Sequence, residues 1–285
     1  MKTRTPAVIA AGSLSLVLAL TACGNDAADE TAVDAVEEEQ EEQKGGLSEL
    51  LSSLGDNTQE VTNYTLTMDM SMPDEDLGDI EISMVSEVMD DPAAVQSTMN
   101  MPFLGEMMFD LMSLGGELPA DVTAEDLGTI VVIVEEGQDP LMANQNGLYG
   151  DTAWIRTDAS NMDQNPDEVF DVESLPELAG ALAELDQAEE TGNETIDGVE
   201  TTVVAGSMTG EELGELDTAQ AAALKELMGG SIAGSLDVTL WIDADGFPMR
   251  MEFSDDEADV AMEFSALGST SFEVPAEEEI GAMQP

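Results

Sequence analysis

Few side chains in this sequence could do chemistry, and their types limit what that chemistry could be. The 285 residues include no histidine and a single cysteine, Cys23, so the usual pairs of nucleophile and base are missing. No Gly-x-Ser-x-Gly elbow and no glycine-rich phosphate loop is present. Acidic residues number 63, so any catalytic carboxylate pair chosen from the sequence would be arbitrary. We therefore expect a protein that is not an enzyme and uses no cofactor.

The thiol of Cys23 has the setting of a lipid attachment site. It ends the segment Leu20-Thr21-Ala22-Cys23, which resembles the bacterial lipobox. Upstream, Lys2 and Arg4 precede an apolar run of about 14 residues, which fits a secretory signal and is shorter than the roughly 20 residues of a membrane span. We expect residues 1–22 to be the signal peptide and a lipidated Cys23 to hold the mature chain on the cell membrane, facing the extracellular side. The alternative is an ordinary signal peptide with an incidental cysteine.

The charge balance of the chain excludes one class of partner. Only 6 basic residues accompany the 63 acidic ones, and loss of Lys2 and Arg4 with the signal peptide changes the net charge from −57 to −59. Nucleic acid is excluded because phosphate binding requires a basic surface. The acidic residues are spread along the whole chain, which indicates solvation and an adaptation to saline surroundings. Salt should therefore screen the repulsion and stabilise the fold.

Methionine, rather than aromatic residues, supplies much of the apolar volume. The chain has 19 methionines, and only 4% of its residues are aromatic. The plainest interpretation is a sheet core packed with flexible side chains. Two alternatives stay open, namely the lining of a lipid cavity and a thioether site for copper(I). The methionines concerned recur at alternate positions of expected strands and so share a face: Met68, Met70 and Met72, then Met99 and Met101, then Met249 and Met251.

Two cations and one acidic turn are further candidates. Arg156 and Arg250 stand out because cations are scarce, and each could hold an anionic headgroup at a cavity mouth. A surface ion pair with a carboxylate is the plainer expectation for both. The run Asp243-Ala244-Asp245-Gly246 hints at a calcium loop, but the distal glutamate of an EF-hand is missing. A hairpin turn explains it, and we expect no metal site.

The elements that must position these residues begin after an acidic leader. Residues 23–46 contain the run Glu37-Glu38-Glu39-Gln40-Glu41-Glu42 and almost no large apolar residue, which is typical of a disordered tether. A short helix is expected over residues 47–54. Residues 47–280 show no break in pattern and are expected to form a single domain, followed by a tail at 281–285.

Alternating apolar residues predict a sheet of about ten strands. The first three strands form an antiparallel meander, and the last three form another. Short strands between them are separated by Gly-containing turns such as Asn146-Gly147 and Asp197-Gly198. The expected strands cover residues 64–72, 80–84, 95–101, 129–134, 140–143, 147–149, 152–157, 199–208, 236–243, 249–253 and 260–264.

Helical spacing predicts three or four helices. Apart from residues 47–54, helices are expected over 103–118, with a Gly115-Gly116 stop, over 175–188, and over 221–228, with a Gly229-Gly230 stop. Together the elements predict an α+β fold in which a long, curved antiparallel sheet, an unclosed half β-barrel, wraps around the helices.

The order of these elements resembles the LolA-like and LppX/LprG-like lipoproteins of the bacterial cell envelope. The resemblance covers roughly residues 47 to 280 and rests on several short motifs besides the lipobox, the tether and the Tyr-led first strand. These motifs are Asn146-Gly147-Leu148-Tyr149 before Trp154-Ile155-Arg156, Ile196-Asp197-Gly198-Val199, and the closing Leu240-Trp241-Ile242-Asp243-Ala244-Asp245-Gly246-Phe247-Pro248 with Arg250 beyond. The resemblance implies a half-barrel with a hydrophobic cavity that binds or carries acylated lipids without catalysis.

On this basis the sequence predicts a membrane-anchored protein whose cavity binds an acylated lipid or glycolipid and which meets an envelope transporter or acceptor protein. The extreme acidity and methionine content depart from the family pattern and leave the ligand open. The alternatives are a structural or interaction lipoprotein with a filled core and a methionine-based metal-binding lipoprotein. The residues expected to line the cavity are Tyr64, Leu66, Met68, Met70, Ile82, Met84, Met99, Met101, Val238, Leu240, Ile242 and Met251.

Overall fold

In the computed structural model the chain divides into two units, Met1–Glu42 and Gln43–Pro285. The structure describes residues 61–74, 78–115, 122–145, 147, 149–157, 181 and 188–282, all of them in the second unit. The predictions for the signal peptide, Cys23, the tether, the helix over residues 47–54 and the end of the tail lie outside the described residues. So does most of the helix expected over residues 175–188, of which Ala181 is described as helical and Ala188 as not helical.

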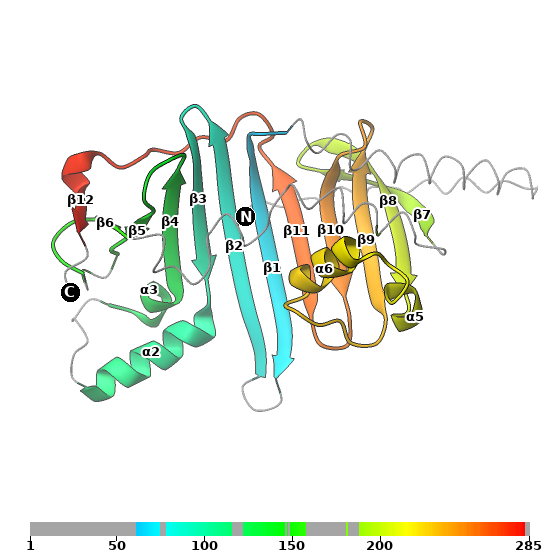
Figure 1. Cartoon of the computed structure of the whole chain (residues 1–285), viewed down its shortest axis with the longest axis horizontal. Coiled ribbons are helices and arrows are strands. Elements are labelled where there is room, and N and C mark those ends of the chain that lie inside the picture. The colour runs from blue at the N-terminus through cyan, green and yellow to red at the C-terminus, as the bar shows by residue number, and fades with distance from the viewer. Residues whose placement is uncertain are drawn as a thin grey trace, which may run out of the picture. The chain divides into compact units, whose positions relative to one another are not determined.

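The second unit is built on one sheet of twelve strands (Figure 1). Its order is β12-β6-β5-β4-β3-β2-β1-β11-β10-β9-β8-β7, and the two end strands do not pair with each other, so the sheet is unclosed. Neighbouring strands are antiparallel, except that β12 runs parallel to β6. The strands are β1 Tyr64–Asp74, β2 Gly78–Asp90, β3 Ala93–Asn100, β4 Thr129–Glu135, β5 Leu141–Ala143, β6 Trp154–Arg156, β7 Glu189–Ile196, β8 Val199–Met208, β9 Leu236–Asp243, β10 Pro248–Ser254, β11 Asp259–Ser265 and β12 Ile280–Ala282.

The first and last meanders meet at the centre of the sheet. β1 pairs with β2 on one side and with β11 on the other, so the two ends of the domain sequence become neighbours. We call β1–β6 the N-terminal half-sheet and β7–β11 the C-terminal half-sheet. This pairing confirms the predicted α+β fold with an unclosed, mostly antiparallel sheet.

Strand alternation gives the sheet one apolar and one polar face. Met68 lies opposite Met84 on β2 and opposite Met262 on β11. The same row continues to Met99 on β3 and to Met251 on β10. Five methionines on five neighbouring strands therefore stand side by side across the middle of the apolar face.

Four α-helices accompany the sheet among the described residues: α2 Pro102–Gly115, α3 Ala124–Gly128, α5 Gly210–Leu213 and α6 Thr218–Leu227. Helix α6 lies across β9–β11, while α2 and α3 lie at the end of β3 and β4 (Figure 1). Asp217 caps α6 by accepting hydrogen bonds from the backbone N–H groups of Ala219 and Gln220. Leu224, Leu227 and Met228 join the apolar face in the main core.

Several expectations from the sequence were wrong in detail. Strand β7 was missed because its residues are polar and, apart from Ile196, mostly exposed, so they show no apolar alternation. The short strand expected over residues 147–149 is wrong, because Gly147 lies in a bend and Tyr149 in a turn. Helices α3 and α5 and strand β12 were also missed because they have only three to five residues.

Two turns show why their neighbouring strands end where they do. Asp197 and Gly198 both have positive φ angles, 47° and 83°, which is the conformation of a tight hairpin turn between β7 and β8. In the β9–β10 turn, the carboxylate of Asp243 accepts hydrogen bonds from the N–H groups of Asp245 and Phe247, at 2.9 and 2.8 Å. This carboxylate is used by the backbone of the turn, in agreement with the hairpin interpretation.

Candidate ligand-binding face

The residues predicted to line a cavity share the apolar face of the sheet. Met70 lies opposite Ile82, and Met251 lies opposite Leu240. The other members occupy alternate positions of the same strands, and Met101 directly follows β3. The prediction that alternation gathers these side chains on one surface therefore agrees with the register.

Burial divides this set into two groups. Eight members are at most 8% exposed and belong to the packed core. Their neighbours leave them almost no accessible surface, whereas a side chain that lines an open cavity must expose surface to it. The eight are Tyr64, Leu66, Met68, Met84, Val238, Leu240, Ile242 and Met251.

The other four, Met70, Ile82, Met99 and Met101, are only half-buried. They lie on β1, β2 and the end of β3, within the N-terminal half-sheet. Three further apolar side chains adjoin them on this face, and the predicted set did not include them, although alternation signals each one: Met72, Ile80 and Ile130. We call these seven residues the half-exposed patch.

Helix α2 borders the half-exposed patch. It begins at Pro102, directly after Met101, and it contacts β2. Leu104, Met108, Phe109 and Met112 are half-buried, and they lie on the same side of the helix as the buried Gly105. The half-buried side of α2 is therefore the side that packs on α3, next to the end of the patch.

The first turn of α2 is fixed by a backbone contact with α3. A Cβ atom added at Gly105 would lie 2.1 Å from the carbonyl oxygen of Ala124, and one added at Gly128 would lie 2.7 Å from that of Met101. The N–H of Met101 donates to the carbonyl of Gly128 at 2.8 Å, and the N–H of Gly105 donates to that of Met101 at 3.1 Å. Only glycines allow this approach, so they determine where α2 leaves the sheet.

A concave surface lies over the polar face, and its chemistry differs from that of the patch. It is a hollow of about 590 Å³ whose lining includes the carboxylates of Asp69, Glu81, Glu252 and Asp259. Met70 and Ile82 also belong to its lining, but most of the other lining residues occupy the polar-face positions of their strands. An acyl chain would gain little there, because the carboxylates would have to lose their hydration.

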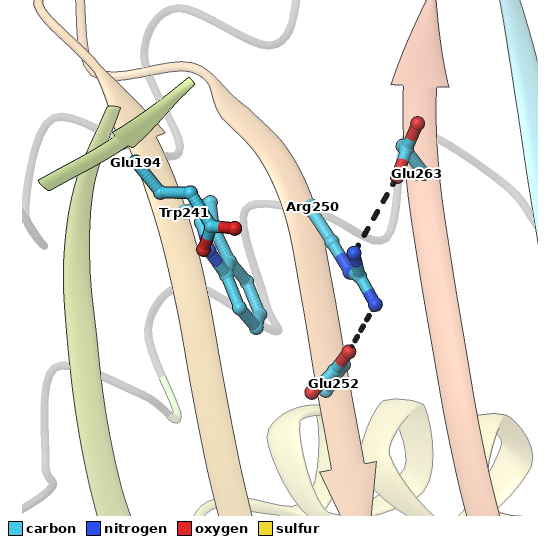
Figure 2. Close-up of polar contacts among 5 residues, drawn as sticks. All are labelled: Glu194, Trp241, Arg250, Glu252 and Glu263. Carbon is cyan, nitrogen blue, oxygen red and sulfur yellow. Dashed lines mark hydrogen bonds and ion pairs between the residues drawn. The ribbon is translucent and has the colours of Figure 1, made fainter. Parts of the chain in front are cut away.

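Arg250 belongs to this polar face and is paired. Its guanidinium forms ion pairs with Glu252 and, at 3.8 Å, with Glu263 (Figure 2). The guanidinium also lies 5.0 Å from the ring centre of Trp241, whose indole N–H donates to Glu194 at 2.7 Å. This agrees with the surface pairing expected for Arg250 and places it on the opposite side of the sheet from the half-exposed patch.

Arg156, the other predicted headgroup residue, lies on β6 near the sheet edge. It forms an ion pair with Glu277 at 3.2 Å, and the Glu277 side chain is 87% exposed. Lys225 was not selected from the sequence, yet it lines a smaller hollow of about 220 Å³ between α5, α6 and residues 232–234. Among the described residues no carboxylate forms an ion pair with Lys225.

The pKa values of two carboxyls are shifted, and both groups belong to helix caps. The hydroxyl of Thr123, followed by its backbone N–H, lowers the pKa of Asp126, and Thr209 lowers the pKa of Glu212 in the same way. Within the described ranges no group of three or more His, Cys, Asp or Glu side chains is placed to hold a metal ion. In the methionine row, Met68, Met84, Met251 and Met262 are buried and add packing volume, and Met99 is half-buried.

These features define a class: an α+β protein with an unclosed sheet, whose apolar face carries a packed core and, at the ends of β1–β4, a half-exposed patch. The family model of the LppX_LprAFG lipoproteins matches residues 110–270, more than half of the sequence. The chain belongs to this family, which confirms the resemblance to LppX/LprG-like lipoproteins.

Solved structures of low identity are also similar. LprF from Mycobacterium bovis is 13% identical with a TM-score of 0.45, and the match covers 80% of this chain and 95% of that chain. The lipoprotein LppX of Mycobacterium tuberculosis is 14% identical with a TM-score of 0.43, and the match covers 80% of this chain and 98% of that chain. A LolA superfamily protein from Nitrosomonas europaea is 10% identical with a TM-score of 0.24, and the match covers 80% of this chain and 94% of that chain. The search of curated proteins found no match. In the described part of the chain, no helix combines the length and apolar character of a membrane span.

Proposed function

We propose that the protein is a lipoprotein, anchored through Cys23 at the outer face of the cell membrane, that binds an acylated lipid or glycolipid and carries it within the cell envelope without catalysing a reaction. Membership of the LppX_LprAFG family supports a lipoprotein of the envelope. The observation that carries the proposal is the half-exposed patch: apolar side chains that stay partly accessible on the face that also carries the packed core. Contiguous apolar surface of this kind marks ligand or partner sites in soluble domains.

We infer that the ligand binds at the half-exposed patch. The acyl chain would lie along Met70, Ile82, Met99 and Met101 of the N-terminal half-sheet, beside α2. Methionine side chains suit this role because three rotatable bonds and a polarisable sulfur let them reshape around chains of different length. The eight buried members of the predicted set would instead support the sheet behind the ligand. Transfer to an envelope transporter or acceptor protein is the step we expect after binding.

The charge of the ligand's headgroup is less constrained. Arg156 and Arg250 are paired with carboxylates, and Arg250 lies on the polar face. Headgroup binding by either arginine would require that its ion pair open, and exposed pairs of this kind contribute little to stability. Both arginines remain predictions for headgroup contact.

The test is native mass spectrometry of the chain from Gly24 to Pro285, which lacks the lipidated Cys23, followed by organic extraction and lipid analysis. We expect a co-purifying acyl lipid. Met99→Glu should reduce the bound fraction at least tenfold, because a carboxylate in the patch must be desolvated beside the acyl chain. Thr98→Glu is the matched control: it changes the neighbouring half-buried residue of the same strand on the opposite face, and it should keep the lipid.

Each alternative function has its own result in the same experiment. A mass without ligand that stays unchanged when lipid vesicles are added would remove lipid carriage and favour a structural lipoprotein. A stable copper(I) adduct formed by a chain that ignores lipid would favour metal binding by the methionines. Circular dichroism of both variants must show a folded sheet for the comparison to hold.

A further inference from the structure

Helix α2 presents a second apolar surface, on the side opposite the contact that Gly105 makes with α3. Phe103, Met107, Leu111 and Leu114 are 37%, 50%, 70% and 88% exposed. Their spacing of four, four and three residues places them on one side of the helix. We call this row the α2 stripe.

The fold gives α2 little support of its own. Among its 14 residues only Gly105 is buried, and that residue lies in the contact with α3. Helices of this length are marginal in water, because most helical stability in proteins comes from the packing of an apolar face. The exposure of the stripe increases toward Leu114, the end farthest from the glycine contact. An apolar surface that packed on the stripe would therefore stabilise α2.

We propose that the α2 stripe lies on the outer leaflet of the membrane that anchors the protein. This inference rests on the proposed function, because it assumes the lipidated Cys23. The sequence predicts a disordered tether after Cys23; 37 residues separate Cys23 from Val61, and a flexible chain of that length would span roughly 35 Å on average. That reach keeps the domain beside the bilayer, so a weak apolar contact is repeatedly made without a second anchor.

The charge pattern favours the same surface. The whole chain carries a net charge of −57, yet α2 contains only two acidic residues, Glu106 and Asp110. An acidic domain approaches a membrane at lower cost through an element that carries few charges. A helix with one apolar side can lie in the interface plane with that side among the acyl chains.

The position of α2 connects the bilayer with the ligand. The helix begins directly after Met101, a residue of the half-exposed patch, and it contacts β2. A lipid that leaves the outer leaflet beside the α2 stripe would reach the apolar face of the sheet without crossing the acidic polar face. The helix would thus be the element at which the protein loads or releases its lipid.

The test uses the full lipidated protein in vesicles of seven parts phosphatidylcholine and three parts phosphatidylglycerol. Leu114→Cys carries an environment-sensitive dye, and part of the lipid carries a nitroxide quencher on its acyl chain. Acylated Cys23 does not react with the dye, and the chain has no other cysteine. We expect a blue shift and at least threefold stronger quenching than for the control Ser113→Cys, an exposed residue on another side of the same helix.

Other results would overturn the inference. Equal, weak quenching at both positions would show that the stripe stays in water. The chain from Gly24 to Pro285, which lacks the acyl anchor, can be labelled at the same position and measured without vesicles. If its blue shift grows with protein concentration, the stripe contacts a second copy of the chain. If the labelled protein still binds lipid in mass spectrometry while residue 114 stays unquenched, membrane contact fails and the proposed function stands. If residue 114 is quenched but the protein binds no lipid in mass spectrometry, membrane contact stands and the proposed function fails.

Discussion

The two halves of the sheet have the same sequence pattern but different packing. In the C-terminal half-sheet, Leu236, Leu240 and Phe253 are at most 1% exposed, and α6 places Leu224 against them. In the N-terminal half-sheet, Leu66 and Met84 are buried as well, but Met70, Ile82 and Met99, which alternate just as regularly, are half-buried. Alternation thus decides which face a side chain occupies, whereas the elements packed over that face decide whether it is closed. The covered positions supply packing energy, and the half-exposed patch is the part that we propose binds the ligand.

The largest expected effect is a core truncation that separates the halves. Leu240→Ala should lower the free energy of unfolding by about 2–5 kcal/mol, because it leaves a cavity in a region with no room to relax. Met99→Ala, on the same face but half-buried, should lower the free energy of unfolding by about 1 kcal/mol or less, because the Met99 side chain removes less apolar surface from water on folding. Urea denaturation followed by circular dichroism measures both. Equal losses would mean that the patch is packed as tightly as the core and would break the comparison.

The next effect concerns the attachment of α2. Gly105→Ala should lower stability by about 1–3 kcal/mol, because the added Cβ would stand 2.1 Å from the carbonyl oxygen of Ala124 and the helices must separate. This loss exceeds the roughly 0.5–1 kcal/mol that alanine gains over glycine inside a helix.

Gly210→Ala is the matched control for this prediction. Its nearest neighbouring atom, the carbonyl oxygen of Gly234, would lie 3.5 Å from the new Cβ, which is ordinary contact. Stability should therefore change little. Hydrogen exchange should show that Gly105→Ala opens α2 while the amides of β9 and β10 stay protected. Uniform loss of protection in both halves would contradict a local attachment.

A smaller effect is expected from the cap of α6. Asp217→Ala removes the acceptor for the N–H groups of Ala219 and Gln220 and should cost about 1 kcal/mol. Asp217→Asn keeps an oxygen acceptor and should recover most of that loss. Thermal unfolding of the two variants measures the difference. If Asp217→Ala also exposed Leu240 to solvent, the cover over the C-terminal half-sheet would depend on its cap more than on apolar packing.

The sequence predicted the sheet better than it predicted the site, and the reason is physical. Alternation is a local property, so strands such as β8 and β9 were predicted with the bounds that the structure shows. Strand β7 has no such pattern. It forms because backbone hydrogen bonds to β8 and the Asp197-Gly198 turn hold it in the sheet. Burial of Leu240 and exposure of Met99 depend on which helix covers each face, and no local pattern encodes that.

The charged candidates show a signal that the sequence did contain. Arg250 stands between Met249 and Met251, both of which are buried, so alternation alone places its side chain on the opposite, polar face. Applying the same rule to Arg250 that was applied to the methionines would have separated it from the cavity candidates. By contrast, the sequence contains no signal for the hollow beside Lys225, because that hollow depends on how α5 and α6 are placed in space.

The smallest expected effect is an acid titration of two capping boxes, one beside each half-sheet. Thr123 and Asp126 begin α3, and Thr209 and Glu212 begin α5, with the same reciprocal hydrogen bonds. The pKa of each carboxyl is lowered by its threonine, so each contributes stability that is fully present above its unfolded value and is lost as pH falls through the lower, folded value. NMR titration should show both pKa values returning toward ordinary ones in Thr123→Val and Thr209→Val. Because the two caps are alike, they should respond alike; a shift that vanished at only one of them would show that the halves differ in local capping as well as in the helix that covers them.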